Sequence, residues 1–243
     1  MPRSNDILNK GMTEHGAGQV DVVNGVVVVN HPLVEQLAVP SERGGAEFRK
    51  SLRVFGNILA EVLMREANLG QRPTVIAVPR GGIPVGYGIK AASAADSSLI
   101  ISNSGKHRDP QEPVLPENLS KILTSSTGVI IADGIIGRGD TIIEHLRAVL
   151  ANMPDGWDGS IAVLSAIASA PGLQAIRKEF GGVEMSFITG RVVPEDDCGP
   201  VNFGTQEQPK WVYFVGKSLN IGDFGDMVES GITYQQLCEE SIA

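Results

Sequence analysis

The chain has few cysteines and no long apolar run, and each scarcity excludes a class of protein. The 243 residues include two cysteines, Cys198 and Cys238, which are too few for a zinc site built from cysteine pairs and suit a reducing compartment. No stretch approaches the ~20 apolar residues that span a bilayer, and the N-terminus lacks the apolar core of a signal peptide. We therefore expect a cytoplasmic protein that makes no contact with a membrane.

Positive charge is also scarce. The sequence has 20 lysines and arginines against 28 aspartates and glutamates, a net charge of −8 and a pI near 5.0. Binding to duplex nucleic acid depends on a basic face that neutralises phosphates. We therefore expect no nucleic-acid partner, and any polyanionic ligand must be held by local positive groups.

The length and composition favour one globular unit. With 42% hydrophobic residues in 243, the chain has enough apolar material for one α/β domain with a large core. Residues 1–19 are polar and glycine-bearing, so we expect a mobile lead-in there. Residues 20–243 are expected to form a single domain.

Short apolar runs alternate with amphipathic stretches along most of this domain. The expected strands cover residues 74–78, 98–102, 128–132, 160–166, 185–189 and 211–215, and residues 26–29 are expected to form a short strand or an extended arm. The expected helices cover residues 46–68, 84–95, 141–151 and 171–180. Such alternation predicts an α/β fold with an open parallel, Rossmann-like sheet and helices on both faces. Residues 190–243 break the rhythm and are expected to contribute, with an N-terminal segment, a small hood over the ligand edge.

Three expected loops leave the carboxyl ends of strands, where open parallel sheets bind ligands. They cover residues 79–82, 103–121 and 133–141. The second has three prolines and many charges without either period, as in segments that cover active sites. It is a candidate lid.

The third loop has the features of a phosphate cradle. Gly137 and Gly139 let successive N–H groups converge, and a helix expected from Thr141 adds its dipole and a hydroxyl. Asp133, at the expected end of the strand, can accept hydrogen bonds from two neighbouring sugar hydroxyls. The pattern alone also fits a tight turn without a ligand. It is neither a Walker A nor a GxGxxG motif, which disfavours a nucleotide triphosphatase and a dinucleotide fold.

Residues 129–141, VIIADGIIGRGDT, resemble the loop that binds 5-phosphoribosyl 1-diphosphate (PRPP) in the uracil phosphoribosyltransferases, members of the type I phosphoribosyltransferase fold. That loop is typically written VDPMLATGGS. The chain keeps Asp133 and a terminal hydroxyl at Thr141. It differs at Arg138, where the family has threonine, and at Asp140, which replaces one of two paired glycines.

Further segments follow in the family's order between residues 26 and 226. Residues 31–33 and 46–49 resemble its HPL and AEFR elements, and residues 78–82 resemble the pyrophosphate loop ILRAG with its arginine as Arg80. Residues 108–114 resemble the YRDEETLEPV loop. Residues 213–226 resemble the ends of the base-binding YIVPGLGDAGD segment, with three residues more between Tyr213 and Asp223.

The resemblance implies transfer of the 5-phosphoribosyl group from PRPP to uracil or a uracil-like base, with release of pyrophosphate and with Mg²⁺ as the companion of PRPP. It implies catalytic roles for Arg80, Arg108, Asp133 and Asp223. It implies PRPP binding by Arg80, Lys106, Arg108, Asp133, Gly134, Ile135, Ile136, Gly137, Arg138, Gly139, Asp140 and Thr141. It implies base binding by Tyr213, Phe214, Val215, Gly216, Ile221, Gly222 and Asp223, the last also reaching PRPP-bound Mg²⁺ indirectly.

Several alternatives stay open. Tyr213 and Phe214 fit strand packing as well as contact with a base, and His107 and His145 are expected at the surface. The chain can be a regulator that binds PRPP without efficient catalysis, or a phosphoribosyltransferase of specialised metabolism with another acceptor. The family's enzymes are oligomers, commonly dimers, so the resemblance also implies a homodimer.

Overall fold

A computed structural model describes residues 19–38, 45–66, 69–93, 97–102, 115–219 and 221–222. Its main sheet has seven strands in the order β1-β2-β7-β6-β5-β3-β4. The strands are β1 (Gln19–Val23), β2 (Val26–Asn30), β3 (Pro73–Ala77), β4 (Ser98–Ile101), β5 (Gly128–Ile136), β6 (Ser160–Ser169) and β7 (Met185–Val193). The helices are α1 (Pro32–Ala38), α2 (Gly45–Glu66), α3 (Gly82–Ala92), α4 (Leu119–Thr124), α5 (Asp140–Ala151) and α6 (Ala170–Glu179).

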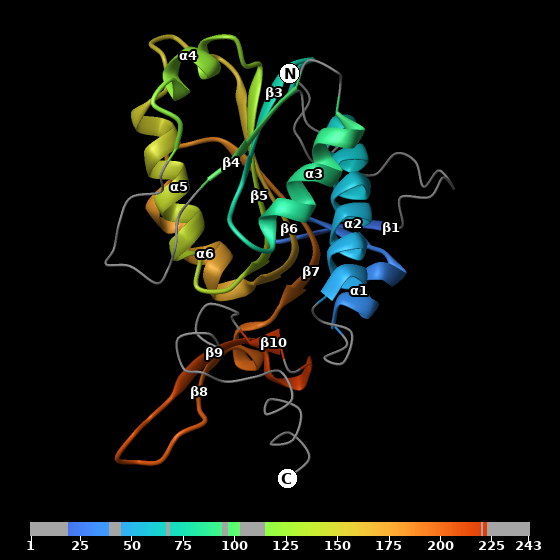
Figure 1. The fold of residues 1–243 in the computed structure, drawn as a ribbon, viewed down its shortest axis with the longest axis vertical. Coiled ribbons are helices and arrows are strands. Elements are labelled where there is room, and N and C mark those ends of the chain that lie inside the picture. The colour runs from blue at the N-terminus through green and yellow to red at the C-terminus, as the bar shows by residue number, and fades with distance from the viewer. Residues whose placement is uncertain are drawn as a thin grey trace.

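Helices cover both faces of this sheet (Figure 1), with α1, α2 and α3 on one face and α4, α5 and α6 on the other. Neighbouring strand residues alternate between the two cores: Ile130 packs against the α2–α3 face and Ile131 against the α5–α6 face. Strands buried on both faces read as continuous apolar runs, which is why the sequence revealed them. The expected α/β fold with an open parallel sheet is confirmed.

One edge of the sheet is antiparallel. Strand β1 pairs with β2 in a hairpin, and β2 runs parallel to β7. The expected strand at residues 26–29 is therefore part of the sheet. The β1 strand was not expected, because four of its five residues are exposed and give no apolar run.

A second sheet lies in the C-terminal region that was expected to contribute to a hood, whereas the N-terminal strands β1 and β2 belong to the main sheet. The second sheet contains β8 (Gly199–Asn202), β9 (Trp211–Gly216) and β10 (Ile221–Gly222) in the order β10-β9-β8, and its β8–β9 hairpin extends away from the main sheet (Figure 1). Phe203 stacks on Phe214 with ring centroids 5.8 Å apart. The sequence predicted only β9, because β8 is short and contains Gly199 and Pro200, which rarely occur inside strands.

Two expected boundaries were wrong in ways that affect function. Strand β5 continues past Asp133 to Ile136, because β6 continues beside it and pairs Ile135 with Ile167. The candidate lid is shorter than expected, since α4 begins at Leu119, and its residues 103–114 lie outside the described ranges. Within those ranges, every helix is too short or too polar to cross a membrane.

Candidate functional site

Two glycines, Gly81 and Gly134, bring the turn after β3 that bears Arg80 (the arginine turn) against β5, the strand that bears Asp133. A β-carbon on Gly134 would lie 2.9 Å from the α-carbon of Gly81, and a β-carbon on Gly81 would lie 3.6 Å from the Asp133 carboxylate. Side chains larger than hydrogen would separate these backbones. The structure therefore places Arg80 and Asp133, about fifty residues apart in sequence, in adjacent segments at the carboxyl edge of the sheet.

Arg80 itself has an unusual backbone conformation. Its φ is +68°, in the left-handed region, where non-glycine residues are uncommon. The turn is held on both sides: the Val78 N–H donates to the Ala132 carbonyl at 2.9 Å, and the Ile83 N–H donates to the Arg80 carbonyl at 3.3 Å. Such outliers cluster at ligand-binding positions. The exposed Arg80 side chain leaves from this turn.

The Asp133 carboxylate is half-buried and accepts a hydrogen bond from the Gly134 N–H at 2.6 Å. The sequence predicted that Asp133 ends the strand and that the cradle spans residues 133–141. In the structure Asp133, Gly134, Ile135 and Ile136 belong to β5, and the turn is limited to residues 137–139. Asp133 consequently lies one segment before the turn, not inside it.

The turn leads into helix α5 through Gly139, which has a φ of +88°. As a glycine at the N-cap, it supplies no side chain to the first N–H groups of the helix, and these have no acceptor within the helix. Asp140 and Thr141 are the first two helical residues. A helix start without a side-chain cap is suited to an anion, because N–H groups and the helix dipole point the same way.

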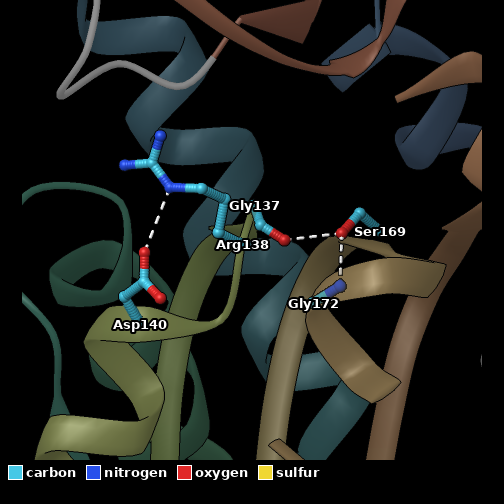
Figure 2. A network of polar contacts seen from close by, with 5 residues as sticks. All are labelled: Gly137, Arg138, Asp140, Ser169 and Gly172. Atoms are coloured by element: carbon cyan, nitrogen blue, oxygen red, sulfur yellow. Dashed lines mark hydrogen bonds and ion pairs between the residues drawn. The ribbon is translucent and has the colours of Figure 1, made fainter. Parts of the chain in front are cut away.

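The other side of the turn packs against the start of α6 (Figure 2). Ser169 donates a hydrogen bond to the Gly137 carbonyl at 2.5 Å and accepts one from the Gly172 N–H at 2.9 Å. A β-carbon on Gly172 would lie 2.1 Å from the Gly137 oxygen, and one on Gly139 would lie 2.7 Å from the Gly172 oxygen. The turn is therefore fixed by backbone contact with α6.

Arg138 and Asp140 form an ion pair across the turn (Figure 2), with 3.1 Å between Nε and Oδ2. The two side chains are 45% and 59% exposed, so water competes with the pair. The Arg138 guanidinium also lies 5.6 Å from the ring centroid of Tyr213 on β9. Arg138 thus joins the turn to the hood, a contact that the sequence did not predict.

Tyr213 lies between several polar groups. Partial burial raises the pKa of its hydroxyl, and so does the nearby Cys198, whereas a hydrogen bond with Ser169 and the positive charge of Arg138 act in the opposite direction. The pKa of the buried Cys198 thiol is raised to about 11, first by burial and then by the neighbouring Asp197. Both groups are therefore protonated at neutral pH.

His145 was expected at the surface, and this was wrong. It is fully buried on α5, where its Nδ1 contacts the Thr141 carbonyl at 2.6 Å and its Nε2 contacts the Ser102 hydroxyl at 2.7 Å. Since a carbonyl only accepts, Nδ1 carries the proton and Nε2 accepts from Ser102 when the ring is neutral. Burial lowers the pKa of His145, despite the opposing effect of the Thr141 hydrogen bond.

The described residues that were expected to bind the base divide into three groups. Phe214, Val215 and Ile221 are buried in hydrophobic clusters, so their side chains are occupied by packing, as the alternative interpretation of Phe214 holds. Gly216 and Gly222 offer main-chain groups at the paired ends of β9 and β10. Tyr213 contacts Arg138 of the turn at residues 137–139.

Three expected site residues lie outside the described ranges: Lys106, Arg108 and Asp223. His107 lies there too. Within the described part of the chain, no group of three or more histidine, cysteine and acidic side chains is placed to hold a metal ion. A Mg²⁺ ion bound through diphosphate oxygens would require few protein ligands.

Ser169 and Gly172 were not predicted as site residues. The sequence contains a helix-start signal at this point, a serine followed by proline two residues later. Nothing in that signal shows that the capping hydroxyl also holds a turn 32 residues earlier. The pairing of β5 with β6 creates this proximity.

Comparison with solved structures shows the same fold in other proteins. The AQ2163 protein from Aquifex aeolicus is 19% identical, with 70% of this chain and 88% of that chain covered and a TM-score of 0.56. The adenine phosphoribosyl transferase from Trypanosoma brucei is 15% identical, with 72% and 87% covered and a TM-score of 0.49. The orotate phosphoribosyltransferase from Mycobacterium tuberculosis is 14% identical, with 66% and 87% covered and a TM-score of 0.43.

Identities this low establish the fold alone, and TM-scores below 0.5 are too weak to support an argument. No protein-family model matches the sequence, and no curated protein matches it significantly. The activity must therefore be argued from the site.

Proposed function

We propose that the protein is a phosphoribosyltransferase, which transfers the 5-phosphoribosyl group of PRPP to a ring nitrogen of uracil or a uracil-like base. A bond forms between C1 of the ribose and the acceptor nitrogen while the C1–O bond to diphosphate breaks. The diphosphate leaves with the electron pair, and the acceptor nitrogen releases its proton. The proposal rests on the ordered resemblance of five segments to the uracil phosphoribosyltransferases.

The structural observation that carries the proposal is the contact between Gly81 and Gly134. This contact places the turn that bears Arg80 beside the strand that bears Asp133. A three-residue turn then joins the end of that strand to the uncapped start of α5. A phosphoribosyl diphosphate needs these three things: a cation for the diphosphate, a carboxylate for the ribose hydroxyls and N–H donors for the 5-phosphate. All three occur at one edge of the sheet.

In this proposal the chain acts by positioning and by charge. Asp133 holds the ribose hydroxyls, and the amides of residues 137–141 with the Thr141 hydroxyl hold the 5-phosphate. Arg80 neutralises the departing diphosphate, together with Lys106 and Arg108. Mg²⁺ bound to PRPP would supply further neutralisation. No covalent nucleophile is required, since fixed dipoles and positioned reactants lower such a barrier.

The first test is pyrophosphate release from PRPP and Mg²⁺ with a panel of bases. Release with uracil supports the full proposal. Release only with another base corrects the acceptor, which the three extra residues before Asp223 make a specific possibility. Binding of PRPP without release with any base would support the regulator instead.

A matched pair of variants tests the site. Asp133→Asn keeps the shape of the side chain but removes its charge, so we expect turnover to fall more than tenfold, the scale expected from loss of a positioned charged group. Asp155→Asn makes the same change at an exposed turn beyond α5 and should leave turnover unchanged. Equal kinetics for the wild type and Asp133→Asn would refute the assignment of Asp133.

The cytoplasmic location, expected from the composition, remains a prediction, as do the homodimer and a role in pyrimidine salvage, which the resemblance implies. Size-exclusion chromatography with light scattering measures the oligomeric state directly. A monomer at micromolar concentration would contradict the predicted dimer.

A further inference from the structure

Ser169 is a buried junction of three segments. Its side chain is fully buried. Its hydroxyl contacts the Gly172 N–H of α6 and the Gly137 carbonyl of the turn at residues 137–139, which we call the phosphate turn. Tyr213 of β9 is a third polar neighbour, because a hydrogen bond with Ser169 acts to lower the pKa of the Tyr213 hydroxyl, against the net rise caused by burial. Ser169 therefore lies where the turn, α6 and β9 meet.

The Tyr213 hydroxyl lies beside this junction. The Ser169 proton is directed to the Gly137 carbonyl, which can only accept. The Tyr213 ring lies under the Arg138 guanidinium at 5.6 Å. The Tyr213 ring thus contacts Arg138 of the phosphate turn, and its hydroxyl contacts Ser169, which holds that turn in place.

The next residue of β9 faces the other way, as strand geometry requires. Phe214 is buried against Phe203 in the β8–β9 hairpin. The strand therefore anchors the hairpin with one face and contacts the phosphate turn with the other. Residues 216–222, which begin three residues after Tyr213, include main-chain groups expected to bind the base.

We propose that Tyr213 and Ser169 are positioning residues that couple the hood to the phosphate turn, and that Tyr213 acts on Arg138 and Ser169 instead of contacting the acceptor base. The inference rests on the proposed function in taking residues 137–141 as the phosphate site. It deepens that function by assigning the hood a part in binding the phosphorylated ribose. Tyr213 then affects the ribose phosphate more than the acceptor.

The test is calorimetric binding of ribose 5-phosphate to the full chain. Tyr213→Leu removes the ring beneath Arg138 and the hydroxyl, and we expect binding about tenfold weaker. Tyr213→Phe keeps the ring and loses only the hydroxyl, so about threefold is expected from the sizes of cation–π and hydrogen-bond contributions. Ser169→Ala should resemble Tyr213→Leu, because it frees the Gly137 carbonyl as well. Tyr87→Leu, the same change at an exposed position of α3, is the control and should stay within about twofold of the wild type, as surface substitutions usually do.

Steady-state kinetics supplies the readout that a purely structural role would not move. We expect the KM for PRPP to rise in Tyr213→Leu with the acceptor KM within about twofold. A rise in the acceptor KM with unchanged ribose 5-phosphate binding would overturn the proposal and make Tyr213 a base contact. Thermal unfolding of each variant identifies general loss of structure, and Tyr213→Phe preserves the packing if Tyr213→Leu does not fold.

Failure of the two proposals can be told apart. If the wild type does not bind ribose 5-phosphate or PRPP, the assignment of the phosphate site is wrong, and the proposed coupling between Tyr213, Ser169 and that site is wrong too. If the wild type binds and all three variants at Tyr213 and Ser169 bind equally well, the coupling alone is wrong.

Discussion

The ion pair between Arg138 and Asp140 provides a quantitative test of the phosphate site. Asp140 places a negative charge on the first residue of α5, where the proposed 5-phosphate binds, and Arg138 faces it at 3.1 Å. In the uracil phosphoribosyltransferases that the loop resembles, neither charge is present. Removal of one charge at a time should therefore shift phosphate affinity in opposite directions.

The size of the shift follows from Coulomb's law. Two unit charges roughly 6 Å apart in a water-like dielectric interact by about 0.7 kcal/mol, so a phosphate with about two charges is opposed by about 1.4 kcal/mol, a tenfold effect. Salt screening reduces this, since the Debye length is about 10 Å at 0.1 M ionic strength. We expect Asp140→Asn to tighten ribose 5-phosphate binding about five- to tenfold at low salt, and Arg138→Gln to weaken it by a similar factor.

The assay is isothermal titration calorimetry of both single variants and the double variant at about 50 mM and 500 mM salt. The double variant should bind nearly as the wild type does, because the two changes cancel in charge, and all differences should shrink at high salt. Stability should change little, since both side chains are about half exposed and exposed pairs contribute at most about 1 kcal/mol. Unchanged or weaker binding by Asp140→Asn at low salt would refute the placement of the phosphate beside α5.

Three further predictions concern buried groups. Gly134→Ala, whose β-carbon would lie 2.9 Å from an α-carbon of the arginine turn, should lower both pyrophosphate release and the free energy of unfolding, the latter by about 1–3 kcal/mol, whereas Gly182→Ala in open space should not. Because burial lowers the pKa of His145, the unfolded chain binds more protons below about pH 6.5. The free energy of unfolding should fall from pH 7 to pH 5, and less so in His145→Gln; equal slopes would contradict this. Because the pKa of Cys198 is raised to about 11, the Cys238→Ser variant should react slowly with iodoacetamide at pH 8 until denatured, and rapid labelling of the folded protein would count against a protonated thiol.

The sequence was most informative where local pattern and burial coincide. Strands β3 and β5 are buried on both faces, so their apolar runs were visible in the sequence and their positions were predicted. The amphipathic period of α2 likewise matched the helix found at Gly45–Glu66. Pattern failed for β1 and β8, whose residues are exposed or include glycine and proline.

Part of the site could be predicted from the residue types in the loop. The rest depends on which residues lie close together in the folded protein. The aspartate, the two glycines and the terminal hydroxyl of residues 133–141 fitted both a tight turn and a ribose-phosphate loop, and the resemblance to a family loop favoured the second. Where β5 ends was set by a neighbour: β6 offers hydrogen-bond partners as far as Ala168, so the strand continues to Ile136. A one-dimensional pattern contains no record of such a partner.

The sequence by itself thus determined the α/β class, most of the strands and the loop in which a phosphate is expected, because these depend on local periodicity and on residues close together in the chain. Only the tertiary structure decided that Gly81 touches Gly134, that Ser169 supports Gly137, and that Tyr213 lies under Arg138. Each of these contacts joins residues from different strands or turns. The first two exist because parallel strands bring their carboxyl ends to one edge of the sheet, where distance along the chain no longer limits which residues meet. The third exists because β9 of the second sheet packs beside that edge.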